Sequence, residues 1–311
     1  MEQSTVTLSL KESKQLKRSS IRFRLRKTIP YWFLLPALGL YALFFVYPFV
    51  YAFFLSFHEW NMISPEKIFV GFQNYLSLFS DEVYWISMKN TGLYVLMTVP
   101  ISLLAGLGLA LLIEGVKKGK VLYRLLFFLP VVSSIAIMGI VWTLMYNPQV
   151  GAVNVILGYF GIEGIHWLND PTIALISVAL VGIWNSFGYN VILFISGLKG
   201  VDKNLYEAAA LDGANTWESF KNVTIPMLSP VTFFVFVMSV ISSFQAFTTV
   251  QVMTKGGPNN STNVAVYQIY QEAFQFFSVG TATASATILL ILVVIFTIVQ
   301  LVVGKKLVHY Q

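Results

Sequence analysis

Long apolar runs separated by polar segments dominate the pattern of residues along this chain. About 20 consecutive apolar residues suffice to cross a bilayer as a helix. The pattern therefore predicts an all-α, polytopic membrane protein with six transmembrane helices. The expected spans are residues 29–57, 93–113, 125–146, 172–198, 228–253 and 281–303.

The polar segments between these runs contain turn and helix signals. The stretch from Gly71 to Phe79, within a mixed polar and aromatic segment, predicts a short amphipathic helix at the membrane surface. Asn147-Pro148 and Asn169-Asp170-Pro171 indicate turns, and Gly256-Gly257-Pro258 closes the fifth run. These segments are short connections, so the chain is expected to form one six-span domain.

One polar interruption, between the fourth and fifth runs, has strong local signals. Residues 207–211 predict the end of a short Ala-rich helix, and Gly213 suits the left-handed turn that stops one. Asn215 and Glu218 have the spacing of a capping box that starts a second helix, and Pro226 should end or kink that helix. The expected product is a helix-turn-helix elbow whose small Ala face can fit a groove on a partner.

Composition agrees with a membrane protein. Hydrophobic residues make up 56% of the 311 residues and charged residues only 11%, whereas soluble domains contain roughly a quarter charged residues. The chain has no cysteine, which excludes disulfides, thiol catalysis and Cys-ligated metals.

Lys and Arg are distributed unequally between the two sides of the membrane. If the N-terminus is inside, 17 of the 20 Lys and Arg residues lie on inner segments and 3 on outer loops. The positive-inside rule then places both termini, the basic tail of residues 1–28 and the loop 199–227 in the cytoplasm. Because the basic residues flank apolar runs, membrane topology explains them and nucleic acid is not expected as a partner. The apolar run after the tail is too long for a signal peptide.

The chain has no recognisable catalytic motif. It contains no phosphate-binding Gly-x-x-x-x-Gly-Lys-Ser/Thr sequence and no His-Glu-x-x-His pair, and its three histidines are isolated. We therefore expect neither ATP hydrolysis nor metal catalysis by this chain. No predicted span contains Asp, Glu, Lys or Arg, which argues against an ion-coupled carrier. Energy for any transport should come from another subunit.

Neutral polar and aromatic residues form two clusters inside the fourth and fifth spans. Such residues can hold helices together, or they can line a substrate path. Stacked rings and neutral amides would suit the apolar faces and the hydroxyls of a sugar. The candidate path residues are Trp184, Asn185, Ser186, Tyr189, Asn190, Phe244, Gln245 and Thr248.

The elbow resembles the EAA loop of permease subunits in binding-protein-dependent ABC importers. The resemblance rests on Glu207-Ala-Ala-x-x-Asp-Gly-Ala214, then Phe220, and on Ile225-Pro226-x-Leu228-x-Pro230. Further stretches resemble the carbohydrate branch, which includes the maltose permease larger subunit and the glycerol-phosphate permease. They are Gly71–Tyr75, Asn147-Pro148, Trp167–Pro171 and Thr254–Pro258, and the resemblance extends over residues 30–311.

This resemblance implies a type I ABC importer permease fold, residues 29–311, in a bacterial or archaeal cytoplasmic membrane. It implies four kinds of partner: a second six-span permease subunit, two ATPase subunits that bind ATP and Mg, an external solute-binding protein and a sugar substrate. No cofactor would be bound by this chain. The residues expected to contact the ATPase, within the loop 207–230, are Glu207, Ala208, Ala209, Asp212, Gly213, Ala214, Phe220 and Pro226.

The resemblance also implies which path residues hold a sugar: Ser186, Tyr189, Phe244, Gln245 and Thr248 match the maltose subunit by motif. Gln245 and Thr248 stand where that subunit has asparagines, which argues against maltose itself. Import of glycerol phosphate or a related polyol ester is an alternative substrate class. An ion-coupled secondary carrier and a structural or signalling subunit are alternatives of other kinds.

Overall fold

A computed structural model describes residues 33–307. The chain forms two units that divide after Leu55. The described part of the first unit is one helical run, Phe33–Leu55, which includes the π-helical turn η1 (Ala42–Val46) and α2 (Tyr47–Leu55). The predicted tail, residues 1–28, and the beginning of the first predicted span lie outside the described residues.

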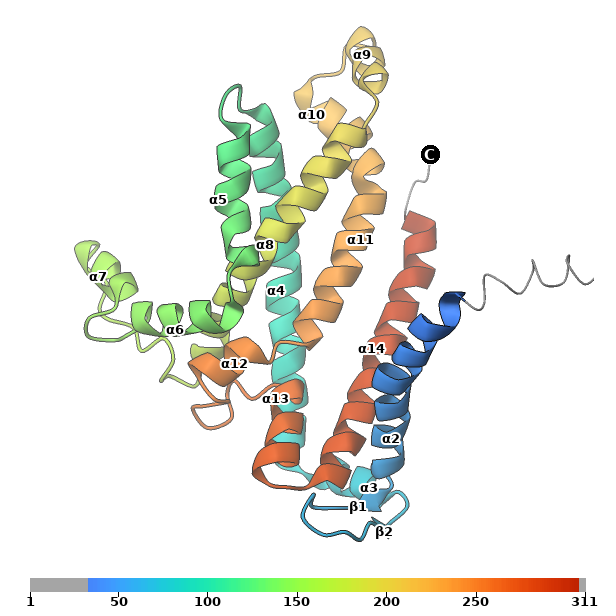
Figure 1. Ribbon diagram of the computed structural model, residues 1–311. Helices are drawn as coiled ribbons and strands as arrows, with labels where there is room; N and C mark the ends of the chain where they lie inside the picture. Colours follow the sequence, from blue (N-terminus) through green and yellow to red (C-terminus); the bar gives the residue numbers. More distant parts are fainter. Residues whose placement is uncertain (1–32, 308–311) are drawn as a thin grey trace, which may run out of the picture. The chain divides into compact units, whose positions relative to one another are not determined.

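The second unit is almost entirely helical (Figure 1). Its described residues include a short antiparallel pair of strands in which His58 lies opposite Phe69. The elements in chain order are β1 (His58–Glu59), β2 (Ile68–Phe69), α3 (Gln73–Ser80), α4 (Glu82–Gly115), α5 (Lys120–Val132), α6 (Ile135–Met145), α7 (Ala152–Tyr159), α8 (Ala174–Gly200), α9 (Lys203–Leu211), α10 (Thr216–Ser219), η2 (Phe220–Thr224), α11 (Ile225–Phe244), α12 (Thr248–Met253), α13 (Ala265–Tyr270), η3 (Gln271–Gln275) and α14 (Val279–Leu307).

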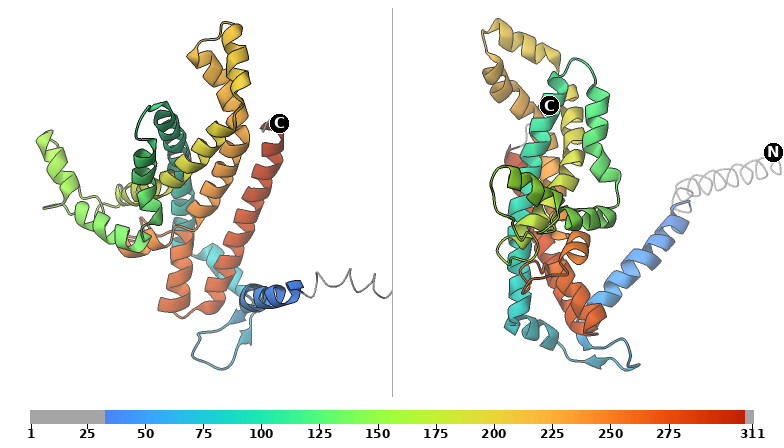
Figure 2. Two further views of the ribbon diagram at one scale, coloured as in Figure 1. Left: turned by 45° about the horizontal axis from the view of Figure 1, so that its top comes forward. Right: turned by 90° about the vertical axis from the view of Figure 1, so that its left-hand side faces the viewer.

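The described residues contain five helical runs that are long and apolar enough to cross a membrane, or six if the bent pair α5–α6 counts as one span. This agrees with the six predicted spans. The segments predicted to be cytoplasmic, namely the α4–α5 turn and the α9–α10 elbow, share one end of the second unit (Figures 1 and 2). The β-hairpin, α3 and α13 lie at the other end.

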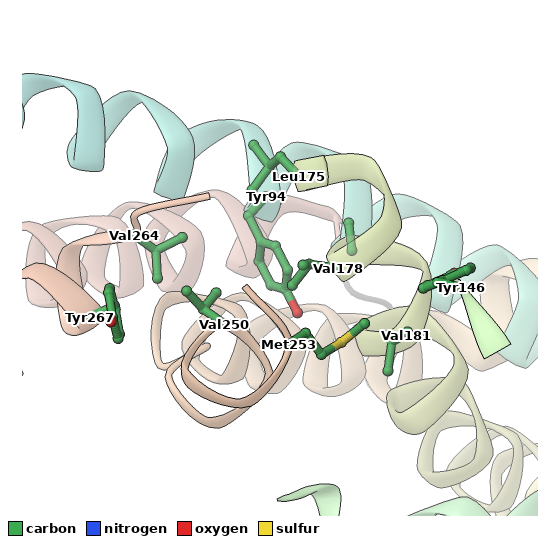
Figure 3. Close-up of a cluster of buried hydrophobic side chains, with 10 residues drawn as sticks. Tyr94, Tyr146, Leu175, Val178, Val181, Val250, Met253, Val264 and Tyr267 are labelled. Atoms are coloured by element: carbon green, nitrogen blue, oxygen red, sulfur yellow. The ribbon is translucent and has the colours of Figure 1, made fainter. Parts of the chain in front are cut away.

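The centre of the second unit is the pair α4 and α8, which cross closely. Gly106 permits this approach, because a Cβ at that position would lie 2.6 Å from the Asn190 Cβ. Beside the crossing, a cluster of buried apolar side chains joins α4, α8 and α12 (Figure 3). It includes Tyr94, Val178 and Val250. Small residues at helix crossings are a common way to pack membrane helices.

The third predicted span differs from the single helix expected for residues 125–146. The structure has two helices there, α5 and α6, which meet at an angle of 97°. Ser133 and Ser134 between them have extended backbone angles, with ψ of 146° and 119°. α6 therefore turns away from the axis of α5 and packs against α12, where Gly139 lies beneath Val252.

The fifth predicted span also differs from expectation at both ends. The helix does not end at Pro226, since Thr216–Phe244 forms one continuous run. The π-helical turn η2 precedes it, and Ile225 N–H bonds the carbonyl of Phe220, five residues back. This wider turn accommodates a residue that lacks an amide donor. At the other end the helix stops at Phe244, and a new helix, α12, begins at Thr248.

Candidate functional site

A cavity of about 450 Å³ lies between α4, α8, α11 and the start of α12. Hydroxyl and amide side chains dominate its polar lining, and the described residues that line it include no Asp, Glu, Lys, Arg or His. The lining residues are Tyr94, Thr98, Ser102, Val131, Ile135, Gly182, Asn185, Ser186, Tyr189, Asn190, Met238, Ser239, Ser242, Ser243, Gln245, Ala246, Phe247, Thr248 and Thr249.

Both helix breaks of the second unit border this cavity. Val131 and Ile135 flank the break between α5 and α6, and residues 245–247 form the break between α11 and α12. Broken helices expose backbone polar groups, and inside a membrane such groups are tolerated where they line a cavity or are buried in protein. Discontinuous helices near the middle of the membrane are a recurring feature of binding sites in transport proteins.

The structure brings six of the eight predicted path residues together at the cavity: Asn185, Ser186, Tyr189, Asn190, Gln245 and Thr248. The other two lie elsewhere. The Trp184 ring packs edge-to-face on Trp142 at a centroid distance of 5.5 Å. Phe244 is buried in a separate apolar cluster and packs 5.8 Å from the Phe296 ring. Neither aromatic residue contributes to the lining.

Two of the cavity amides also connect helices. Asn185 Nδ2 donates to the carbonyl of Pro130 at 2.9 Å, and Asn190 Nδ2 donates to the carbonyl of Ser102 at 3.2 Å. Pro130 lies in the last turn of α5, where carbonyls have no intrahelical partner, so Asn185 satisfies a group that the helix break leaves open. These asparagines therefore hold the cavity walls in place as well as lining them.

A wall of the cavity that we did not predict comes from α4. Tyr94, Thr98 and Ser102 all line it. Their spacing of four residues places them on one face of the helix, in line with Asn90 and Gly106. This polar stripe within an otherwise apolar span was the signal in the sequence that could have identified them.

The predicted elbow is confirmed in its local geometry. α9 ends in a Schellman motif, in which Gly213 has φ +81° and Ala214 N–H bonds the Ala209 carbonyl at 2.9 Å. α10 starts with the predicted capping box, since Asn215 and Glu218 each accept a hydrogen bond from the other's backbone amide. A hydrogen bond of 2.9 Å between the hydroxyls of Tyr206 and Thr224 then ties the two parts of the elbow together.

The predicted coupling residues lie on an open surface of the elbow. Glu207 is exposed and forms no ion pair within residues 33–307, and it caps neither elbow helix. Ala208, Asp212 and Gly213 are also exposed, and the other four coupling residues, Ala209, Ala214, Phe220 and Pro226, are half-buried. Two large apolar residues that we did not predict accompany them, namely Leu211, 90% exposed, and Trp217, 67% exposed. Apolar side chains this exposed on a polar loop are typical of a contact surface.

The described part of the chain offers no metal site. Within residues 33–307, no group of three or more His, Cys, Asp or Glu side chains is placed to hold a metal ion.

Comparison with known proteins gives a family match over most of the second unit. The model of a family described as "Binding-protein-dependent transport system inner membrane component" matches residues 91–309. The probable ABC transporter permease protein YurN of Bacillus subtilis is 36% identical over 279 residues, which cover 88% of this chain and 95% of that protein. The sn-glycerol-3-phosphate transport system permease protein UgpA of Yersinia pestis is 32% identical over 284 residues, covering 91% of this chain and 96% of that protein.

A solved structure has the same fold. It is a chain of a bacterial ABC transporter involved in the import of the acidic polysaccharide alginate, with a TM-score of 0.80 over 94% of this chain and all of that chain. At 20% sequence identity, this likeness concerns the fold alone.

Proposed function

This chain belongs to the family of binding-protein-dependent transport system inner membrane components, and from that premise we propose that its cavity is the path of a neutral sugar or oligosaccharide. The protein is a multi-pass permease of the cytoplasmic membrane of a bacterium or archaeon. It is a non-catalytic transport component, and the ATPase that drives it is a separate chain. We propose further that a second permease subunit completes an alternating-access path, which an external solute-binding protein loads.

The composition of the cavity lining carries the proposal on substrate class. The cavity presents neutral amides, such as Asn185, many hydroxyls, such as Ser186, and the exposed ring of Tyr189. A sugar offers hydroxyl groups that need hydrogen-bond partners and apolar faces that stack on rings. A charged substrate would call for Arg or Lys, and the described lining has neither. The UgpA relative is named for transport of sn-glycerol 3-phosphate, which also carries hydroxyl groups, and this supports a substrate with hydroxyls.

The elbow is proposed as the contact with one of the two cytoplasmic ATPase subunits, and the other ATPase subunit would bind the second permease. Its two helices are held by their own caps, so the surface around Glu207 and Gly213 is preorganised before a partner binds. Glu207 is free to form a charge-assisted contact with a basic group of the ATPase. The exposed Leu211 and Trp217 provide apolar anchors.

Import of sn-glycerol 3-phosphate or a related polyol ester is the second candidate. The observation in its favour is the 32% identity to the UgpA protein. Under this candidate, the phosphate group would be held by the other permease subunit, because the described lining of this cavity contains no cation.

The path can be tested with single cysteines, since the chain has none of its own. Ser186→Cys and Thr248→Cys, which line the cavity, should react with a hydrophilic methanethiosulfonate reagent in membrane vesicles. Leu104→Cys, on the exposed apolar surface of α4, should not react. Addition of the transported substrate should protect only the first two. Equal labelling of all three positions would contradict the proposed path.

Substrate class and energy source are tested with the reconstituted complex in liposomes. We expect ATP-dependent uptake of a labelled neutral oligosaccharide that an ionophore does not abolish. Uptake of sn-glycerol 3-phosphate alone would favour the second candidate, and uptake that collapses with the ionophore would indicate an ion-coupled carrier.

The coupling role is tested by Gly213→Pro, which cannot adopt a positive φ. The variant should insert normally but should no longer link ATP hydrolysis to uptake. Gly161→Pro is the matched control, because Gly161 closes α7 with the same type of turn, at φ +75° and outside the elbow. Normal transport by Gly213→Pro would contradict the coupling role.

A further inference from the structure

Tyr94 occupies an unusual position in the cavity wall. Its ring belongs to the buried cluster of Figure 3, where it projects from α4 into the space between α8 and α12. The residue is only 4% exposed, yet it is one of the residues that line the cavity. Tyr94 therefore combines a fixed, buried ring with access to the cavity.

The hydroxyl group of Tyr94 has no hydrogen-bond partner within residues 33–307. The Tyr94 hydroxyl oxygen lies next to Gly182, and both residues line the cavity, so the hydroxyl lies at the cavity wall. The next hydroxyls along α4 are engaged. Thr98 Oγ1 donates to the Tyr94 carbonyl at 2.7 Å and lies 2.9 Å from Ser243 Oγ, and Ser102 Oγ donates to the Val99 carbonyl at 3.2 Å. The Tyr94 hydroxyl is thus the free group of this wall.

Tyr146 provides the contrast within the same apolar cluster. It is also 4% exposed, but its hydroxyl approaches the carbonyl of Ser177 at 3.5 Å, and it does not line the cavity. Buried tyrosine hydroxyls usually find a partner, and leaving one without any costs about 1–3 kcal/mol. Tyr94 departs from this rule at the place where a substrate could supply the partner.

Gly182 on α8 makes the position of the Tyr94 hydroxyl possible. A Cβ at residue 182 would collide with the Tyr94 hydroxyl oxygen and would lie 3.1 Å from Cζ of the same ring. Gly182 also lines the cavity. Any larger residue at this position would have to displace the phenol.

We propose that Tyr94 and Gly182 form a specificity-determining subsite, in which the Tyr94 hydroxyl hydrogen-bonds a hydroxyl of a neutral sugar and Gly182 leaves the phenol room to reach it. The subsite adds α4 to the walls of the proposed path, which α8 and α11 already form. A site built to hydrogen-bond a substrate hydroxyl discriminates against analogues that lack it. This inference rests on the proposed function of the cavity.

The test measures sugar binding inside the cavity of the full transporter complex. Val131→Cys, at an apolar lining position, serves as the single thiol of this chain and is labelled with a hydrophilic methanethiosulfonate. Maltose, maltotriose and raffinose are each titrated to find the concentration that halves the labelling rate. In the Tyr94→Phe background, this concentration should rise about fivefold for the sugar that protects best, as expected for one lost hydrogen bond. The unfolding temperature should not fall, because no internal hydrogen bond is removed.

Control variants separate a binding role from a structural one. Tyr146→Phe should leave the half-protecting concentration unchanged, because its hydroxyl faces Ser177 and not the cavity. Gly182→Ala should raise this concentration more than Tyr94→Phe does, since it displaces the whole phenol. In the double variant Gly182→Ala/Tyr94→Phe, removal of the colliding oxygen should return it toward the Tyr94→Phe value.

The possible failures are distinguishable. If none of the three sugars protects Val131→Cys in otherwise unchanged protein, the proposed function is contradicted and the subsite with it. If a sugar protects and Tyr94→Phe leaves its half-protecting concentration unchanged, the Tyr94 subsite alone is overturned.

Discussion

The α9–α10 elbow and the loop between α12 and α13 lie at opposite ends of the second unit, and each connects two helices through a short polar stretch (Figure 1). The elbow is held from within: its caps join residues no more than five positions apart, such as Ala214 N–H to the Ala209 carbonyl, and its longest bond, between the Tyr206 and Thr224 hydroxyls, spans 18 residues. The α12–α13 loop is held by hydrogen bonds from a side chain of α4. Asn90 Nδ2 donates to the carbonyls of Asn260 and Asn263, at 2.8 and 3.0 Å, across 170 and more residues of sequence.

The interior of the α12–α13 loop is correspondingly polar and buried. Thr262 and Asn263 are fully buried, and Thr262 Oγ1 bonds the carbonyl of Gly257 at 2.8 Å. A chain of amides continues into η3, from Asn263 to Gln268 and from Gln268 to the buried Glu272. The elbow has the reverse character, with exposed side chains and local bonds. A connection that keeps its shape by local bonds leaves its surface available to a partner, whereas one that is fixed by distant side chains becomes part of the fold.

The largest effect should come from removing the distant anchor of the α12–α13 loop. Asn90→Leu deletes two hydrogen bonds and removes the Asn90 donor from the Asn263 carbonyl, while the Asn260 carbonyl keeps its bond from Asn263 N–H, so the change should cost about 2–3 kcal/mol of unfolding free energy. Thermal unfolding of the purified protein in detergent measures the loss. Asn222→Leu, at an exposed position of the elbow, is the control and should change little. Equal unfolding temperatures for the two variants would remove the contrast between the regions.

A smaller effect should come from Glu272, beside the α12–α13 loop, which makes the stability of the protein depend on pH. Burial raises the pKa of Glu272 from an ordinary 4.5 to about 7, with a contribution from nearby Asp81 and a partly opposing hydrogen bond from Gln268. Between these two pH values the folded protein holds a proton that the unfolded chain has released. Stability should therefore decrease as pH rises from about 4.5 to about 7.

Glu272→Gln tests this pH dependence, since glutamine replaces the protonated carboxyl without a charge. The unfolding temperature of this variant should vary less across that pH range than that of the unchanged protein. Glu163→Gln, which replaces an exposed carboxylate, should keep the original slope. If Glu272→Gln keeps the slope too, the pH dependence originates elsewhere.

The smallest effect should come from weakening the elbow, because its bonds are local. Asn215→Ala removes the capping box of α10, worth about 1 kcal/mol. Hydrogen exchange of the first amides of α10 should accelerate about fivefold, while the unfolding temperature of the whole protein stays nearly constant. Thr216→Ala, at the next position, is the control and should leave exchange unchanged. A large fall in unfolding temperature for Asn215→Ala would show that the elbow is not locally held.

Features that depend on neighbouring residues could be predicted from the amino-acid sequence alone. Run length and hydropathy predicted the spans, and the caps at Gly213, Asn215 and Glu218 predicted the elbow, because a cap closes its hydrogen bonds within a few residues. The spacing of the Glu207–Ala214 motif indicated the family, because such a motif can be read from neighbouring residues alone. The cavity-lining residues of α8 were also largely predictable, since amides and hydroxyls are rare in an apolar span.

The direction in which the predicted path residues face, and the positions where the spans break, follow from packing between helices. Trp184 and Phe244 belong to the predicted clusters, but packing against Trp142 and Phe296 turns them away from the cavity. The break at Ser133 accompanies the packing of α6 against α12, where Gly139 lies against Val252. In a membrane span nearly every position is apolar, so hydropathy does not indicate which face meets a neighbour. That choice depends on contacts such as the one between Gly182 and Tyr94, which join helices far apart in the sequence.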